Sequence, residues 1–232
     1  MLDAIFSRDC AVCGTWLDDS CVGVCWDCAR RLTLVTEPFC RRCGDPVDGD
    51  IHDPFDCSSC RRQSPVFARA RSVYRFREPL NALVRRFKYQ ADLELVRLFL
   101  DGMTACIRVN FDRSTWDAVV DVPLTRRRER ERTFNQSRLL AGELAVRLRV
   151  ELAPRQAIVR VRETRSQTGL HAARRRENVR GAFASFLPSW VMGRRFLLVD
   201  DVMTTGATVD ACAAALKAEG AVRVDVLTVA RG

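Results

Sequence analysis

The chain has no apolar run of about 18 residues, the length that a membrane-spanning helix needs, and only two lysines, two histidines and two tyrosines occur among its 232 residues. The first residues lack a basic segment followed by an apolar one, which is the pattern of a secretory signal. These absences predict a protein without a membrane span that stays in the cytoplasm. The length is sufficient for one full hydrophobic core and a small appendage.

Cysteine, by contrast, is abundant, with 11 residues. In a cytosolic chain such a number indicates metal sites rather than disulfides. Two C-x-x-C pairs complete a tetrahedral zinc site with four sulfur ligands, and four such pairs are present: Cys10/Cys13, Cys25/Cys28, Cys40/Cys43 and Cys57/Cys60. Eleven residues separate the first two pairs and thirteen separate the last two, which favours two sequential zinc sites. Interleaved pairing is the alternative, and redox chemistry or an iron–sulfur cluster is a less favoured interpretation.

The formal net charge of +9 is concentrated in two segments. Residues 123–132 carry five arginines against two glutamates, which gives +3, and residues 160–180 carry seven arginines against two glutamates, which gives +5. Residues 1–62 instead carry seven arginines against eleven acidic residues, or −4. Each site of four thiolates and one Zn²⁺ would add about −2 more. The cysteine-rich module is therefore acidic, and the positive charge belongs to the rest of the chain.

The most informative segment is residues 196–208, with the sequence FLLVDDVMTTGAT. Its apolar run is typical of a buried parallel strand, and Asp200 and Asp201 follow at the carboxyl end, the edge where open α/β sheets bind ligands. The next turn opens a helix and offers N–H groups and hydroxyls that suit a phosphate. Its residues are Thr204, Thr205, Gly206, Ala207 and Thr208. Acceptors for sugar hydroxyls beside a phosphate cradle predict a sugar phosphate as the ligand, and an ordinary solvated turn is the less favoured alternative.

Two basic segments could contribute cations to this ligand, and the first of them is expected at the same edge of the sheet. Residues 119–136, VVDVPLTRRRERERTFNQ, indicate a strand, a basic turn and a helix. Arg126, Arg127 and Arg128 in the turn suit the oxygens of a diphosphate, although a solvated charged loop explains this segment equally well when it is taken alone. Residues 162–183 form a long, polar, basic stretch, which we interpret as a mobile cover over an anionic substrate.

Apolar periodicity after residue 62 predicts alternating strands and helices, and hence an α/β fold with a mostly parallel sheet flanked by helices. Strands are expected at residues 67–76, 118–122, 157–161, 196–199 and 222–229, and helices at 79–89, 93–109, 135–148 and 207–218. We expect two domains: a double zinc-binding module over residues 1–62 and the α/β domain over residues 63–232.

The string VDDVMTTGAT resembles the signature of type I phosphoribosyltransferases, which bind phosphoribosyl pyrophosphate. Further matching motifs extend over nearly the full chain: the C-x-x-C pairs, FKY at 87–89, VPL at 122–124, FNQ at 134–136, T-x-x-Q-x-x-L at 164–170 and NVRGAF at 178–183. Taken together, these motifs resemble the ComF family of phosphoribosyltransferase-like proteins, which is linked to DNA uptake in naturally competent bacteria.

The resemblance implies a type I phosphoribosyltransferase-like fold, an N-terminal zinc-ribbon-like module with structural Zn²⁺, and binding of phosphoribosyl pyrophosphate with Mg²⁺. Asp200 and Asp201 would contact the ribose 2′- and 3′-hydroxyls and orient the sugar for any reaction. Residues 204–208 would hold the 5′-phosphate, and the arginines of 126–132 and 162–176 would stabilise the diphosphate.

Three functions are compatible with these features. The first is an active phosphoribosyltransferase of nucleotide metabolism, and the second is a regulator that senses phosphoribosyl pyrophosphate without turning it over. The third is a DNA-uptake factor that binds single-stranded DNA through its basic segments and acts with a DNA-uptake helicase or other competence proteins. We favour a phosphoribosyl-pyrophosphate-binding ComF protein that acts in DNA uptake, because nothing in the sequence identifies an acceptor nucleophile.

Overall fold

A computed structural model describes residues 9–51, 53–90, 92–111, 116–132, 134–163 and 177–232. Within them, five strands form one parallel sheet in the order β1-β7-β6-β2-β3. Their bounds are β1 Arg69–Arg75, β2 Ala118–Asp121, β3 Glu151–Leu152, β6 Arg195–Met203 and β7 Arg223–Arg231. The expected parallel α/β sheet is thus confirmed.

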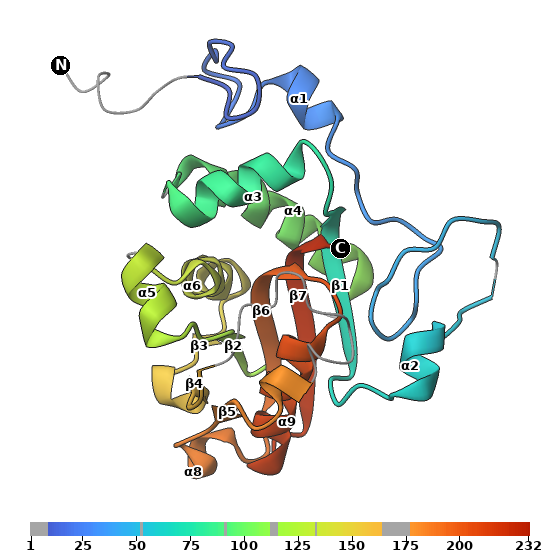
Figure 1. Ribbon diagram of the computed structural model, residues 1–232, viewed down its shortest axis with the longest axis vertical. Coiled ribbons are helices and arrows are strands. Elements are labelled where there is room, and N and C mark those ends of the chain that lie inside the picture. The colour runs from blue at the N-terminus through green and yellow to red at the C-terminus, as the bar shows by residue number, and fades with distance from the viewer. Residues whose placement is uncertain (1–8, 52, 91, 112–115, 133, 164–176) are drawn as a thin grey trace.

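Helices cover both faces of the sheet (Figure 1). The helices α3 (Leu80–Tyr89), α4 (Glu94–Asn110) and α6 (Gln136–Leu148) pack on one face, and α9 (Ala207–Ala218) packs on the other. Successive side chains of a strand point to opposite faces of the sheet. Leu197 and Val199 of β6 therefore pack with α3, α4 and α6, while Phe196 and Leu198 pack on the face covered by α9. Burial on both faces explains why the segment is apolar without a gap.

The strand expected at residues 157–161 lies outside the main sheet. A 3₁₀ turn, η2 (Arg155–Ala157), precedes the short strand β4 (Val159–Arg160), which pairs antiparallel with β5 (Phe183–Ala184). Each of the two strands has only two residues, so apolar periodicity could not assign them to a sheet. The short helix α8 (Pro188–Val191) follows β5.

The basic turn expected after β2 is a helix, α5 (Arg126–Arg132). Arginine and glutamate are good helix formers, and Arg127 Nε lies 2.8 Å from Glu131 Oε1, one turn later. Because the helix begins five residues after the end of β2, it is held close to the carboxyl edge of the sheet.

The N-terminal module contains the short helices α1 (Trp26–Arg30) and α2 (Ser58–Arg62) and contacts the α/β core at two places. Cys10, Leu17 and Val24 belong to the same buried cluster as α3 and α4. Further along the module, Val35 N donates to Val73 O of the edge strand β1 at 2.9 Å. None of the helices that the structure describes has the length and apolar character needed to cross a membrane.

Candidate functional site

The carboxylate pair lies within the last part of β6, which extends beyond the expected strand as far as Met203. Asp200 is half-buried and Asp201 is buried. Asp200 Oδ1 accepts hydrogen bonds from Ser137 Oγ at 2.8 Å and from the Asp201 backbone N–H at 2.9 Å. Lys88 Nζ lies 3.0 Å from Asp201 Oδ2. Both carboxylates are therefore held by side chains from other elements, α6 and α3.

Burial raises the pKa of Asp200 to about 7, and the neighbouring charge of Asp201 acts in the same direction. The Ser137 hydroxyl and the Lys88 ammonium oppose this rise because both favour the ionised carboxylate. A carboxyl group with a strongly raised pKa at the ligand edge of a sheet is a frequent property of functional sites.

The start of α6 connects β2 to the carboxylate pair. Asn135 is the N-cap, and its Oδ1 accepts from the backbone N–H groups of Ser137 and Arg138 at 3.0 and 3.3 Å. Its Nδ2 donates to Asp121 Oδ2 at 3.0 Å, and Arg138 Nη1 lies 2.9 Å from Asp121 Oδ1. This buried network fixes the first turn of α6 and so places the Ser137 hydroxyl against Asp200.

The expected phosphate cradle is the turn between β6 and α9. Gly206 is the N-cap of α9 and has φ 75°, a left-handed conformation that favours glycine. Thr205 Oγ1 accepts from the Ala207 N–H at 3.4 Å, and Ala207 is buried. Thr204 and Thr208 line the same cavity as the carboxylate pair. The five residues of this turn thus divide into two that face the cavity and three that shape the turn.

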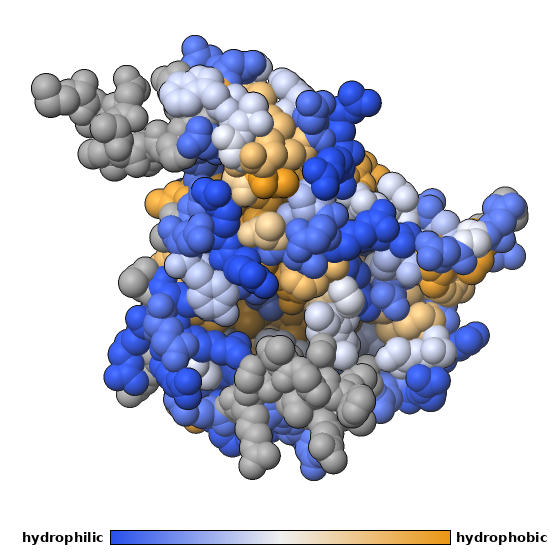
Figure 2. Space-filling view, turned by 45° about the horizontal axis from the view of Figure 1, so that its top comes forward, coloured by the Kyte–Doolittle hydropathy of each residue, from blue (hydrophilic) through white to orange (hydrophobic). Residues whose placement is uncertain are grey.

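The cavity has a volume of about 650 Å³. One side is formed by the carboxylate pair with Lys88 and Ser137, and α5 contributes Arg127, Arg128 and Arg132. Figure 2, which brings the carboxyl edge of the sheet forward, shows hydrophilic residues over most of this face and apolar residues in its recess. A site with acceptors on one side and cations on another suits a ligand that carries hydroxyls and several anionic oxygens.

Some of the expected site residues lie outside the described residues. The side chain of Arg126, which begins α5, is one of them. Residues 164–176, which hold most of the proposed cover and the T-x-x-Q-x-x-L motif, are the others. Arg160 at the end of β4 and Glu163 at the start of the cover line the cavity.

Lys88, Asn135 and Ser137 are site residues whose roles the sequence analysis missed. The motifs FKY and FNQ contain the first two, but a motif alone does not show that Lys88 contacts Asp201 or that Asn135 contacts Asp121. Asn135 stands directly before a helical pattern that follows a strand ending at the ligand edge. Its position therefore indicated a helix N-cap close to the site. The ion pair between Lys88 and Asp201 depends on how α3 packs against the sheet, and no local sequence pattern indicates it.

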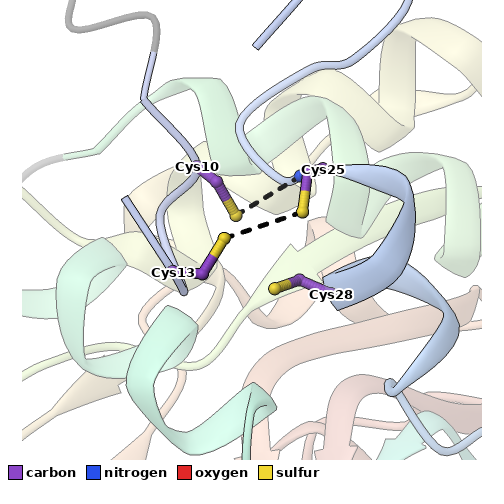
Figure 3. A group of neighbouring side chains, drawn as sticks. All are labelled: Cys10, Cys13, Cys25 and Cys28. Carbon is purple, nitrogen blue, oxygen red and sulfur yellow. Dashed lines mark hydrogen bonds between the residues drawn. The ribbon is translucent and has the colours of Figure 1, made fainter. Parts of the chain in front are cut away.

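The eight cysteines form two groups of four, namely Cys10, Cys13, Cys25 and Cys28, and Cys40, Cys43, Cys57 and Cys60. Within each group the sulfur atoms lie within 4.8 Å of one another. Figure 3 shows the first group, with the sulfur atoms of two separate segments directed toward a common centre. The pairing is thus sequential rather than interleaved, and four sulfur ligands in each group fit structural zinc.

The electrostatics of the two groups also favour a bound cation. Burial raises the pKa of Cys28 and of Cys43 to about 12, and nearby thiolates act in the same direction. Hydrogen bonds with Thr15 instead lower the pKa of Cys13 to about 6. Four thiols this close cannot all ionise without a cation between them, and Zn²⁺ would supply that charge.

The second cysteine group packs directly on the edge strand of the sheet. Ala70 N of β1 donates to Arg42 O at 2.6 Å. Gly44, in the turn that follows Cys43, has φ 65°, and a Cβ on it would lie 2.6 Å from Ala70 O. Only glycine fits this close approach, so the module covers an edge that would otherwise expose unpaired backbone groups.

Comparison with known proteins agrees with this architecture. Residues 1–62 match the family model of the double zinc ribbon domain, and residues 135–232 match that of the phosphoribosyl transferase domain. The chain is 36% identical to the DNA utilization protein YhgH of Salmonella typhimurium over 96% of each chain. It is 29% identical to competence protein F of Haemophilus influenzae, over 97% of this chain and 98% of that one. The chain belongs to the ComF family.

Further relatives of this ComF chain include competence protein ComFC of Bacillus subtilis, which is 26% identical over 95% of this chain and 88% of that one. Among solved structures, a glutamine phosphoribosylpyrophosphate amidotransferase from B. subtilis aligns with 57% of this chain at 22% identity and a TM-score of 0.38. That match spans only 26% of the amidotransferase chain.

Proposed function

We propose that this ComF chain binds phosphoribosyl pyrophosphate together with Mg²⁺ in the cavity at the carboxyl edge of its sheet. The observation that carries the proposal is the arrangement around one cavity of about 650 Å³: a carboxylate pair, the turn that opens α9, and the basic helix α5. Asp200 and Asp201 would accept from the ribose hydroxyls, residues 204–208 would hold the 5′-phosphate, and Arg127 and Arg128 would contact the diphosphate.

Mg²⁺ would enter with the ligand rather than occupy a site built by the protein alone. Within the described residues, the groups of three or more histidine, cysteine or carboxylate side chains close enough to hold an ion are the two cysteine groups. Mg²⁺ is commonly bound by substrate phosphates with only one or two carboxylates from the protein. It would neutralise part of the diphosphate charge between the carboxylates and α5.

Isothermal titration with phosphoribosyl pyrophosphate, with and without Mg²⁺, tests this proposal. We expect Mg²⁺-dependent binding in the wild-type protein and its loss in the double variant Asp200→Asn/Asp201→Asn. Asp117→Asn is the matched control, because Asp117 pairs with Arg195 at the amino end of β6, away from the cavity. Equal binding by the double variant and the wild-type protein would refute the assigned site.

We further propose that the protein acts in DNA uptake or utilization, as the names of its relatives suggest. The basic helix α5 supports a contact with the backbone of single-stranded DNA. Binding should fall steeply with salt and be lost when Arg126, Arg127 and Arg128 are changed to glutamate. Charge reversal of Arg30 and Arg31, exposed residues of the acidic module, is the control. Binding that is insensitive to salt or to the α5 changes would exclude this role for α5.

Turnover is a separate question from binding. A product assay with phosphoribosyl pyrophosphate, Mg²⁺ and a panel of nucleobases distinguishes an enzyme from a regulator that only senses the ligand. Release of pyrophosphate that depends on one base would establish a phosphoribosyltransferase. Binding without product in the whole panel would favour the sensor, and a helicase or another competence protein would then be the recipient of the signal.

We propose that the double zinc ribbon of residues 1–62 braces the α/β domain of residues 63–232. Its first cysteine group shares the buried cluster of α3 and α4, and its second lies against β1. The net negative charge of the module argues against its being the main surface for nucleic acid.

A further inference from the structure

Lys88 stands apart from the other basic residues of the cavity. It is one of only two lysines in the chain, and its Nζ lies 3.0 Å from Asp201 Oδ2. The side chains of the two residues are 19% and 11% exposed, so the ion pair is largely shielded from water. Among the described basic residues that line the cavity, Lys88 makes an ion pair with Asp201, one of the two carboxylates expected to bind the ribose.

The backbone of Lys88 is fixed, whereas its side chain crosses the edge of the cavity. Lys88 lies in the last turn of α3, and its carbonyl accepts from Gln136 Nε2 at 3.2 Å. The preceding residue, Phe87, is buried between the rings of Phe99 and Phe134, at centroid distances of 5.5 and 5.9 Å. A change of partner at Lys88 therefore involves rotation of its side chain and no movement of α3.

The cations of α5 have other contacts. Arg127 pairs with Glu131 on the surface of the helix, and Arg132 Nη1 donates to Gln136 Oε1 at 3.0 Å. Lysine differs from these arginines because its ammonium is a compact charge with rotatable donors on a flexible stem. It can exchange one anionic partner for another more readily than a bidentate guanidinium.

The stereochemistry of the proposed ligand places an anion beside the hydroxyls. In phosphoribosyl pyrophosphate the diphosphate on C1 lies on the same face of the ring as the 2′- and 3′-hydroxyls, whereas the 5′-phosphate lies on the opposite face. When the hydroxyls donate to Asp201, they compete with Lys88 for its oxygen atoms. The nearest anion that could then accept the ammonium is the diphosphate.

We propose that Lys88 is a specificity-determining residue whose ammonium group moves from Asp201 to the diphosphate of the ligand. The carboxylate pair then becomes available chiefly to sugars that carry a diphosphate. The inference rests on the proposed function. A sugar that lacks the diphosphate would displace Lys88 without offering it a partner, and an uncompensated charge in a shielded site is strongly unfavourable. Phosphoribosyl pyrophosphate would thereby be distinguished from ribose 5-phosphate and from ordinary 5′-mononucleotides.

The test compares the affinities of phosphoribosyl pyrophosphate and ribose 5-phosphate, both with Mg²⁺, by calorimetric titration and competition. In Lys88→Met the affinity for phosphoribosyl pyrophosphate should fall about tenfold or more, which corresponds to about 1.4 kcal/mol. The affinity for ribose 5-phosphate should stay equal or rise, because Asp201 is no longer occupied by the ammonium. The ratio of the two affinities should therefore fall at least about tenfold.

Two further variants keep the result interpretable. Lys217→Met removes the other lysine, an exposed residue of α9 that donates to Val222 O, and should leave the ratio unchanged. Lys88→Arg keeps the charge and should retain part of the preference. A uniform loss of both ligands in Lys88→Met, with the ratio preserved, would show a merely structural role and overturn the inference.

Failure of the inference can be separated from failure of the proposed function. If the wild-type protein binds neither ligand, the proposed function is wrong and the inference falls with it. If the wild-type protein binds phosphoribosyl pyrophosphate with Mg²⁺ and Lys88→Met shows the same ratio, the proposed function stands and the inference alone is wrong.

Discussion

Replacement of Asp200 by asparagine should stabilise the ligand-free protein at neutral and alkaline pH. Burial and the charge of Asp201 raise the pKa of Asp200 to about 7, whereas an aspartate in an unfolded chain has a pKa of about 3.9. Between these two pKa values the folded state holds one more proton than the unfolded state. The free energy of unfolding therefore falls as the pH rises through this window and levels off above about pH 7.

The pKa difference of about 3 units, at about 1.36 kcal/mol for each unit, sets an upper value of about 4 kcal/mol. Asp200 is only half-buried, and solvent screening reduces the effect to on the order of 2–3 kcal/mol. About half of the pH window lies above pH 5.5. The stability advantage of Asp200→Asn over the wild-type protein should therefore grow by about 1–2 kcal/mol between pH 5.5 and pH 8.5, equivalent to about 3–6 °C in Tm.

Thermal unfolding of both proteins, followed by circular dichroism without Mg²⁺ or phosphate, measures this advantage. The variant is compared with the wild-type protein at each pH, because acid weakens zinc binding in both proteins. Asp117→Asn is the control: hydrogen bonds with Arg195 lower the pKa of Asp117, so its stabilising effect is fully present throughout this pH range. That variant should be less stable by an amount that does not change with pH. An Asp200→Asn protein whose advantage is absent, or the same at both pH values, would refute the reasoning.

Three other substitutions test the parts that position the site. Gly206 has φ 75°, so Gly206→Ala should lower the free energy of unfolding by about 1 kcal/mol and weaken the binding of phosphoribosyl pyrophosphate. The control Gly142→Ala, within α6, should have neither effect. Denaturant unfolding measures the stability, and calorimetric titration measures the binding. Asn135→Ala removes a buried N-cap and a donor to Asp121 and should cost about 2 kcal/mol or more in denaturant unfolding; a cost near zero would contradict the role of this network. Cys40→Ser should reduce the zinc content from two ions per chain to one and lower the Tm. Metal analysis measures the zinc content, and calorimetry measures the Tm. The control Cys106→Ser, outside both cysteine groups, should retain two zinc ions.

The sequence predicted the parts of the fold that depend on local pattern. The continuous apolar run before Asp200 predicted an inner strand, and its side chains are buried on both faces of the sheet. The regular spacing of the C-x-x-C pairs likewise predicted two sequential groups, as the structure has them. Of the candidate site, the sequence indicated the residues that follow one strand and begin one helix, and their roles in binding stay a prediction.

Features that depend on short segments or on tertiary packing were not predicted. The strands β4 and β5 are too short for a period to appear. The contacts of Lys88 and Ser137 with the carboxylate pair join residues 113 and 63 positions apart, so no local pattern encodes them. The helix α5 is a different case, because its content of arginine and glutamate and the opposite charges of Arg127 and Glu131, four residues apart, were visible in the sequence and favoured a helix over a loop.

The chain contains two kinds of crowded acidic cluster, and they differ in how their charge is compensated. Each cysteine group has four sulfur ligands and so closes around one Zn²⁺ with no position left for a substrate. Among the described residues, the Lys88 ammonium and the Ser137 hydroxyl contact the carboxylate pair, and the raised pKa of Asp200 indicates that the two charges are not fully compensated. A ligand that brought hydroxyl donors and Mg²⁺, as we propose, would complete the compensation and would be selected for that reason. The same imbalance that lowers the stability of the ligand-free protein thus favours the binding that we propose.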